Sequence, residues 1–339
     1  MKTQVFSPSQ LNIAAELLKQ GALVAFPTET VFGLGAVANN SQAIQRVFEV
    51  KGRPADNPLI VHVASIDSVK NYVTEINAVS QRLMEAFWPG PLTIIFPTNA
   101  DKISPLATNY QNTVGLRMPR QLETLLLIEM VGFPLVGPSA NLSTKPSPTH
   151  VDHVLHDLSG KIAGVVANQQ PLTEIGVEST VVYPSQDQIT ILRPGAITAE
   201  MIKEVIDIPV IEKTADQQLA SQEIMSPGVK YTHYSPSQPV YIVKASHSIQ
   251  EWKDILNKEA CKIGLLADQD HVDSLKDYVD FTYCLGPAGD VSQATRNLFA
   301  GLRFLELTDC QVIFAQGFEE ANLSHAYMNR LTKASKLMI

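Results

Sequence analysis

The chain has 339 residues, enough for two domains on the usual length scale, and its 45% hydrophobic content can supply a core for each. The formal net charge of −8 argues against a general nucleic-acid-coating protein, which needs concentrated cationic surface. No apolar run reaches the roughly 18 residues of a membrane span. Residues 1–10 lack the basic and apolar segments of a secretion signal, so we expect a cytoplasmic protein with no membrane association.

The first 205 residues combine helical and strand patterns without an internal repeat. Apolar residues recur at helical spacing between Ser9 and Gly21 and again over 41–51, where Pro54 should end the helix near Arg53. Apolar, strand-like runs cover residues 22–26, 59–63, 92–96, 114–118, 135–137, 180–183 and 189–192. This mixture predicts an α/β (mixed α+β) domain built on a large, twisted mixed sheet with helices packed against it.

The most informative segment runs from Lys51 to His62 and begins Lys-Gly-Arg-Pro. Two cations flank a glycine at the predicted end of a helix, and Gly52 leaves room for a ligand to approach the backbone. Such a pair suits an anion, for example a nucleotide triphosphate. The alternative is a solvated basic turn, because short charge clusters usually face water.

Residues 206–236 change in composition. Residues 216–223 are mostly polar, and 226–236 (Ser-Pro-Gly-Val-Lys-Tyr-Thr-His-Tyr-Ser-Pro) carry prolines and aromatic residues. This pattern is typical of a linker. We therefore predict a first domain over 1–205, a linker over 206–236 and a second domain over 237–339.

The second domain shows a regular alternation of strands and helices. Predicted strands cover 240–243, 262–266, 281–285 and 312–315, and predicted helices cover 249–258, 272–278, 292–307 and 325–336. Strict alternation predicts a parallel, doubly wound sheet. Cys261, Cys284 and Cys310 fall in apolar, strand-like segments of this domain, and we expect buried free thiols.

Several further motifs accompany the Lys51–Arg53 segment in the first 205 residues. They are Thr28-Glu-Thr30, Trp88-Pro-Gly-Pro-Leu-Thr93, Val114-Gly-Leu-Arg-Met-Pro119, Ser139-x-Asn141, Glu178-Ser-Thr-Val-Val182 and Arg193-Pro-Gly195. Together they resemble the signature of the YrdC-like threonylcarbamoyl-AMP synthases. The resemblance implies the two-domain form of this family, in which a small Rossmann-like domain follows a linker.

The family's reaction, as the resemblance implies it, joins L-threonine, bicarbonate and ATP into L-threonylcarbamoyl-AMP and pyrophosphate. Such a nucleotidyltransferase needs Mg²⁺ with its ATP but no covalent nucleophile and no protein metal site. The product would pass to a separate tRNA threonylcarbamoyl transferase. Direct tRNA binding has weak support in the sequence. Two other readings stay open: an RNA-binding protein without catalysis, and a carbamoyl-adenylate-forming carbamoyltransferase module.

The resemblance also implies nucleotide-binding residues. Lys51 and Arg53 would neutralise the ATP phosphates and act as the catalytic residues. Further nucleotide contacts are expected from Asn57, Thr113, Ser139, Asn141, Ser147, Arg193 and Tyr234. Other readings are a turn role for Asn57 and a helix-cap role for Ser139 or Asn141.

Threonine-binding residues follow in the same way: Thr30, His62, Arg117 and Ser179. His62 has a core histidine as its alternative reading, and Thr30 a turn hydroxyl. Arg117 lies in an otherwise apolar strand and needs a partner, either the threonine carboxylate or an internal Asp or Glu.

Two other features carry weaker hypotheses. Asp152, His153, His156 and Asp157 have a spacing seen in metal sites, but we predict the solvated face of a helix. The linker is rich in aromatic residues, and we expect it either to connect the domains or to fold over the cleft as a lid with Tyr234 against the nucleotide.

Overall fold

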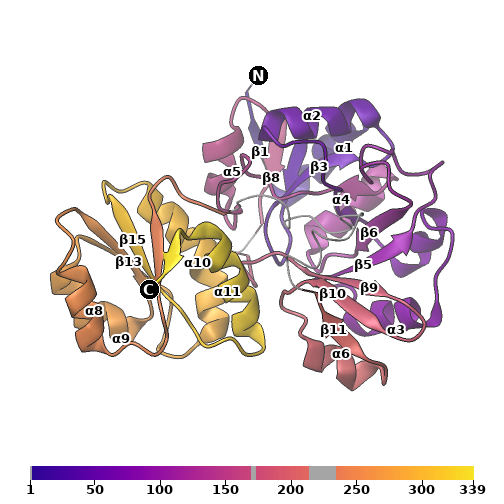
Figure 1. The fold of residues 1–339 in the computed structure, drawn as a ribbon. Coiled ribbons are helices and arrows are strands. Elements are labelled where there is room, and N and C mark those ends of the chain that lie inside the picture. The colour runs from indigo at the N-terminus through magenta and orange to yellow at the C-terminus, as the bar shows by residue number, and fades with distance from the viewer. Residues whose placement is uncertain (1, 169–172, 214–233) are drawn as a thin grey trace.

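The computed structural model describes residues 2–168, 173–213 and 234–339. Two units lie side by side, and each is built on its own β-sheet with helices packed against it (Figure 1). The mixed α/β fold predicted from the sequence is confirmed. Among the described residues, no helix is both long and apolar enough to cross a membrane.

Eleven strands in the described part of the chain form the mixed sheet of the first unit. Their spatial order is β1 (Gln4–Phe6), β8 (Gly164–Val166), β2 (Val24–Phe26), β3 (Gly33–Val37), β7 (Leu135–Val136), β4 (Val61–His62), β6 (Thr113–Arg117), β5 (Leu92–Pro97), β9 (Thr180–Pro184), β10 (Ile189–Arg193) and β11 (Val210–Glu212). Strand β11 pairs with β10, so the sheet extends into the segment 206–236 that composition assigns to a linker. Residues 214–233 of that segment lie outside the described residues.

The helices of the first unit cover this sheet. They are α1 (Leu11–Lys19), α2 (Ser41–Lys51), α3 (Ala78–Phe87), α4 (Leu122–Val131), α5 (Val151–Leu158) and α6 (Ala199–Val205), with short 3₁₀ turns η1 (Pro8–Gln10) and η2 (Ile66–Asn71). Helix α2 begins where the Asn40 side chain accepts a hydrogen bond from the Ala43 amide, and it ends at Gly52 in the left-handed conformation. The helix predicted over 41–51 is thus confirmed, and its end places Lys51 and Arg53 beside each other at a strand-rich edge.

The second unit holds a parallel five-stranded sheet within the described residues, in the order β14 (Phe281–Cys284), β13 (Ile263–Ala267), β15 (Val312–Gln316), β12 (Val240–Val243) and β16 (Leu337–Met338). Its helices are α8 (Ile249–Leu256), α9 (Gln269–Leu275), the 3₁₀ turn η3 (Lys276–Tyr278), α10 (Val291–Glu306) and α11 (Leu323–Ala334). The predicted alternation is confirmed. Strand β16 is an addition that the sequence did not indicate.

Helices α10 and α11 face the first unit (Figure 1). Val31 and Val177 of the first unit, together with Tyr234, pack into the apolar cluster formed by these two helices. Arg303 on α10 also crosses the boundary, and its Nη2 lies 2.8 Å from Asp157 Oδ2 on α5. The boundary therefore has an apolar core and a buried ion pair.

The helix α5 corrects one sequence prediction. Asp152 and His156 are exposed, as expected for a solvated face, but His153 is half-buried and Asp157 is buried at the boundary between the units. Burial alone would raise the pKa of Asp157, but Arg303 and His156 outweigh it and hold that pKa below its ordinary value. Asp157 is a structural anchor because a partner from the second unit reaches it.

The cysteine prediction is also partly wrong. All three thiols are free, yet Cys310 alone among them is buried, whereas Cys261 and Cys284 are half-buried. Cys284 ends β14, an edge strand with one open side, and Cys261 precedes β13 rather than lying in it. An apolar neighbourhood in sequence therefore did not guarantee burial at a sheet edge.

Gly176 lies where the backbones of the two units approach each other closely. Its φ is +84°, and a Cβ built there would overlap the Arg296 backbone of α10. Gly132 also has a positive φ, +76°, but nothing lies within 4 Å of its Cβ position. We expect Gly132→Ala to lower the free energy of unfolding by about 1 kcal/mol through backbone strain. Gly176→Ala should lose about 2–3 kcal/mol more because the units must separate. Equal losses in denaturant titrations would contradict this account.

Candidate active site

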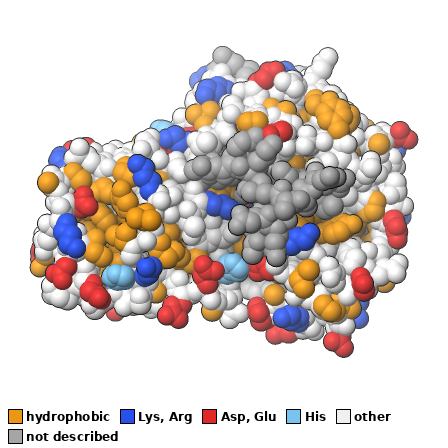
Figure 2. Space-filling view, in the orientation of Figure 1, with side chains coloured by type: hydrophobic (Ala, Val, Ile, Leu, Met, Phe, Trp, Pro, Cys, Tyr) orange, Lys and Arg blue, Asp and Glu red, His pale blue; other side chains and the backbone are white. Residues whose placement is uncertain are grey.

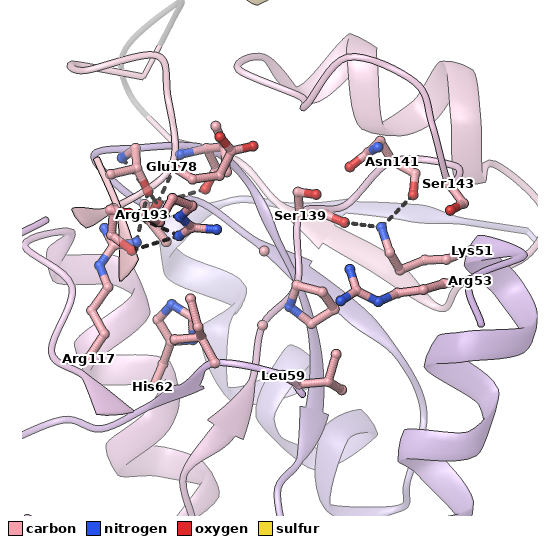
Figure 3. A pocket seen from close by; sticks show the side chains of 18 of the residues that line it. Lys51, Arg53, Leu59, His62, Arg117, Ser139, Asn141, Ser143, Glu178 and Arg193 are labelled. Carbon is pink, nitrogen blue, oxygen red and sulfur yellow. Dashed lines mark hydrogen bonds between the residues drawn. The ribbon is translucent and has the colours of Figure 1, made fainter. Parts of the chain in front are cut away.

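A pocket of about 780 Å³, open solvent at its mouth included, lies where several strand and helix ends of the first unit meet. Charged and polar side chains form much of its lining, as in pockets that bind polar small molecules. Figure 3 shows its labelled side chains in two groups, with Lys51, Arg53, Ser139, Asn141 and Ser143 on one side and His62, Arg117, Glu178 and Arg193 on the other. The polar and charged side chains of the lining thus lie on two sides of one pocket.

The first group is organised around Lys51. Its Nζ donates hydrogen bonds to the carbonyl oxygens of Ser139, at 2.5 Å, and Asn141, at 2.6 Å. The side chain is 2% exposed, and burial, with repulsion from Arg53 as the next cause, lowers the pKa of Lys51 well below its ordinary 10.5. An anionic ligand would offset both effects, because it supplies the negative charge that these neutral carbonyls lack.

Asn141 closes the same side of the pocket. Its Nδ2 donates to the carbonyls of Leu142 and Lys145, both at 2.8 Å, and these bonds fix the orientation of the amide. Its Oδ1 is buried and has no hydrogen-bond partner among the described residues. A buried acceptor without a partner is rare in proteins, so this oxygen is suited to a donor on a ligand, such as an amino group.

Arg117 holds a central place in the second group. Its Nη2 lies 2.8 Å from Glu29 Oε1, its Nη1 donates to Thr30 Oγ1 at 2.8 Å, and its Nε donates to the Gly90 carbonyl at 3.2 Å. The sequence left two partners open for this cation, and the internal carboxylate is the one the structure contains. Arg117 still lines the pocket beside Thr30.

Ser179 and Arg193 form the floor of this second group. Arg193 donates from Nε and Nη2 to the Ser179 carbonyl, at 3.1 and 3.0 Å, and from Nη2 to Ser179 Oγ at 3.2 Å. The Ser179 hydroxyl also lies 2.8 Å from Thr93 Oγ1. Burial lowers the pKa of Arg193 to about 10, so it stays a cation at neutral pH. A short hydroxyl and a fixed cation therefore face the same space.

His62 lies on β4 with its ring 5.3 Å from that of Phe26, in an edge-on contact. Burial, with repulsion from Arg117 as the next cause, lowers the pKa of His62 to about 3, so the imidazole is neutral. One ring nitrogen engages the Leu135 backbone, whereas Nδ1 is buried without a partner among the described residues. Because the pocket wall lies against it, Nδ1 is suited to accept a hydrogen bond from a ligand.

The pocket brings together most, but not all, of the residues indicated by the sequence. Its lining includes Lys51, Arg53, Ser139, Asn141, Arg193, Tyr234, Thr30, His62, Arg117 and Ser179. The lining does not include Asn57, Thr113 or Ser147. Asn57 is buried, Thr113 opens β6 at the far end from Arg117, and Ser147 donates a hydrogen bond to Glu178 at 2.5 Å.

Glu178 is one of several pocket residues that sequence reasoning missed, and Lys145 is another charged one. Glu178 is the one carboxylate among the described residues that line the pocket, and it lies within a motif used for the resemblance. Burial alone would raise the pKa of Glu178, but Arg330, Arg193 and Ser147 outweigh it and hold that pKa below its ordinary value. The sequence assigns no role to this acid, because its partner Arg330 lies 152 residues away in the chain.

Tyr234 joins the pocket to the second unit. It lines the pocket, is 6% exposed, and its ring centroid lies 5.0 Å from that of Phe299 on α10. Burial raises the pKa of its hydroxyl to about 12. Tyr234 therefore lies at the pocket, as the sequence predicts. The lid hypothesis also depends on residues 226–233, which lie outside the described residues.

Comparisons with known proteins extend over nearly the whole chain. Residues 16–195 match the family described as "Telomere recombination", and residues 197–336 match "Threonylcarbamoyl-AMP synthase, C-terminal domain". The threonylcarbamoyl-AMP synthases of Bacillus subtilis and Pyrococcus abyssi are each 40% identical, over 331 and 332 residues, covering 96% of this chain and 93% and 94% of theirs. The crystal structure of P. abyssi Sua5 complexed with L-threonine is similar, with a TM-score of 0.89 and 37% identity over 99% of this chain and 100% of that one.

The names of these relatives define the class, an enzyme of the nucleotidyltransferase type that forms an AMP intermediate. The relatives match both units in the same order and with similar length. The chain therefore belongs to the threonylcarbamoyl-AMP synthase family, and its activity is the formation of that adenylate.

The neutral state of His62 predicts how stability depends on pH. Its folded pKa of about 3 lies below the ordinary 6.5, so the unfolded chain takes up the proton first and stability falls as the pH drops below 6.5. Between about pH 6 and about pH 4.5, the free energy of unfolding should fall less steeply in His62→Gln than in the wild type. The difference in slope should be about 1.4 kcal/mol per pH unit. The pKa of His153 is also lowered to about 3, so His153→Gln should reduce the same slope independently of His62. An unchanged slope for His62→Gln would show that its imidazole is not buried in the neutral form.

Proposed function

We propose that the pocket is the place where L-threonine, bicarbonate and ATP combine. The observation that supports this most is the excess of cations: Lys51, Arg117 and Arg193 are each at most 5% exposed, and Glu178 is the one carboxylate in the described lining. Glu29 already pairs with Arg117, but the hydrogen bonds of Lys51 go to neutral carbonyls, and a triphosphate would supply the negative charge that they lack.

The proposed reaction proceeds in two steps. The threonine amine attacks bicarbonate-derived CO₂ and loses a proton, which gives an N-carboxylate. A carboxylate oxygen then attacks the α-phosphorus of ATP, the bond to the bridging oxygen of the β-phosphate breaks, and pyrophosphate leaves with the electron pair. The product is L-threonylcarbamoyl-AMP. Neither step needs a covalent enzyme intermediate, so the residues act by alignment and by charge stabilisation.

Lys51 and Arg53 would act on the triphosphate. Both lie at the end of α2, beside the backbone loop that carries Ser139 and Asn141. Arg53 offers a planar fork for phosphate oxygens, and Lys51 a compact charge. Asn141 would accept from the nucleotide through Oδ1, and Arg193 and Tyr234 would approach it from the opposite wall. Asn57, Thr113 and Ser147 would support the nucleotide site from behind its lining.

Threonine would occupy the side formed by Thr30, His62, Arg117 and Ser179. The neutral imidazole of His62 and the Ser179 hydroxyl are hydrogen-bonding groups of the kind that read a substrate hydroxyl. Arg117 would attract the carboxylate while Glu29 and Thr30 keep its guanidinium in place.

Mg²⁺ would enter with ATP as part of the substrate. Both oxygens of Glu178, the one acid in the described lining, already accept hydrogen bonds, from Ser147 and Arg330. The ATP phosphates would therefore be the main ligands of the ion, and its charge would offset theirs.

The product would pass to a separate tRNA threonylcarbamoyl transferase in the cytoplasm. A mixed carbamic–phosphoric anhydride hydrolyses readily, so a nearby acceptor enzyme would limit its loss. On the face shown in Figure 2, acidic side chains are interspersed with basic ones among the described residues. This mixture, with a net charge of −8, favours transfer of a small molecule over strong binding of tRNA by this chain.

The phosphate role predicts a charge-specific loss of rate. Lys51→Met and Arg53→Met should each lower threonine-dependent pyrophosphate release about 100-fold, since a positioned charge contributes a few kcal/mol to the transition state. Lys70→Met removes an exposed cation far from the lining and should leave the rate unchanged. Wild-type rates in both pocket variants, or release that does not depend on threonine, would overturn the proposed function.

The proposed threonine-binding side of the pocket predicts that the enzyme discriminates between threonine and valine. Valine has the shape of threonine without the hydroxyl, and it would leave a buried polar group of the pocket unpaired. We expect kcat/KM for valine to be lower by about 100-fold or more. Arg117→Met should raise KM for threonine more than KM for ATP. Comparable kcat/KM values for the two amino acids would show that the pocket does not read the hydroxyl.

A further inference from the structure

We propose that Arg330, on the last helix of the second unit, is a positioning residue for the pocket of the first unit. It holds Glu178 and clamps the strand ends that present Ser179 and Arg193. This role rests on the proposed function of the pocket and gives the second unit a direct part in it. Arg330 does not line the pocket, so it would act through the residues it holds.

The Arg330 side chain is fully buried, at 0% exposure, and its hydrogen bonds to Glu178 and Pro194 cross the boundary between the units. Nε donates to Glu178 Oε2 at 2.9 Å, and Nη2 donates to the Glu178 carbonyl at 3.1 Å. Nη1 donates to the Pro194 carbonyl at 2.8 Å and to Asn329 Oδ1 at 2.9 Å. A guanidinium with this many fixed partners has one orientation, which suits it to set the geometry of a site.

The two strand ends held by Arg330 belong to one hairpin. Strands β9 and β10 pair in an antiparallel manner, and Arg193 is in register with Val181. Glu178 immediately precedes Ser179 at the start of this hairpin, and Pro194 immediately follows Arg193 at its end. Arg330 therefore ties together the open end of the hairpin, where the pocket residues lie.

Charge gives the clamp a second effect. Glu178 would repel a triphosphate unless a cation offset it, and Arg193 is the cation next to it on the pocket side. With Arg330 in place, Glu178 has its partner behind the wall, and Arg193 donates to Ser179 instead. Without Arg330, Glu178 would draw Arg193 toward itself and leave the pocket with less positive charge.

Another arginine on the same face of the second unit provides a matched control. Arg296 on α10 also crosses the boundary, where its Nε donates to the Thr173 carbonyl at 3.2 Å. Neither Arg296 nor Thr173 lines the pocket, and the bond involves no carboxylate. Loss of Arg296 should weaken the contact between the units without changing the charge or geometry of the site.

The experiment compares full-length Arg330→Met, Glu178→Gln, the double variant and Arg296→Met. Calorimetry with MgATP and threonine-dependent pyrophosphate release are measured over a range of pH. We expect Arg330→Met to lose about 100-fold in kcat/KM for ATP, a loss of the size caused by small misplacements. The charged or titratable groups around Glu178, besides Arg330, are Arg193, Tyr234, Lys51 and Lys333, and burial lowers the pKa of Lys333 to about 7. Part of the loss should be recovered on lowering the pH, because Glu178 then takes up a proton and Lys333 becomes a cation. The double variant should recover activity relative to Arg330→Met, since the uncompensated carboxylate is gone.

The outcomes separate a positioning role from simple docking. If Arg330 only holds the units together, Arg330→Met and Arg296→Met will lose stability alike, and Glu178→Gln will not rescue the former. That result, or wild-type kcat/KM in Arg330→Met, would overturn the proposal. A wild-type protein without threonine-dependent pyrophosphate release would instead refute the proposed function. The clamp can be tested even in that case, from MgATP affinity alone. A higher affinity in the double variant than in Arg330→Met would support the clamp, and an equal or lower affinity would refute it.

Discussion

The rest of the structure depends on the burial of cationic side chains around one pocket. Lys51, Arg117 and Arg193 are nearly inaccessible, and hydrogen bonds to backbone carbonyls take up much of their donor capacity. Glu29 offsets the charge of Arg117, but the carbonyl groups around Lys51 orient that cation without neutralising it, so an anionic ligand would stabilise this end of the pocket. Binding of ATP and a threonine carboxylate would supply that charge, and this gives the pocket affinity for the charge pattern of the two substrates.

The same constraint explains why two units share one boundary. The wall that carries Arg193 and Ser179 also contains a carboxylate, Glu178, and the second unit supplies the fully buried cation that offsets it. Tyr234 reaches the pocket from the same side and packs on Phe299 of α10. Under the proposal made for Arg330, the second unit supports the pocket from outside.

Local patterns in the sequence were enough for much of the fold. Helix α2 and the β-α alternation of the second unit follow from hydrophobic period and turn residues, so their bounds were predicted to within a few residues. Strand β3 was missed because Gly33 and Gly35 are typical of a loop. In the sheet both glycines lie against the Phe26 ring, where a Cβ would clash, so they serve close packing rather than a turn.

Long-range pairing was beyond such patterns. The sequence could say that Arg117 needs a partner, but not that Glu29 lies beside it, and it gave no role to Glu178 because Arg330 is far away in the chain. The central claim is that the buried cations align threonine N-carboxylate with ATP. Its most direct test is mass spectrometry of the product formed from ¹³C-bicarbonate, threonine and ATP. The account predicts threonylcarbamoyl-AMP carrying one ¹³C in its carbamoyl group, and an AMP product without that carbon would contradict it.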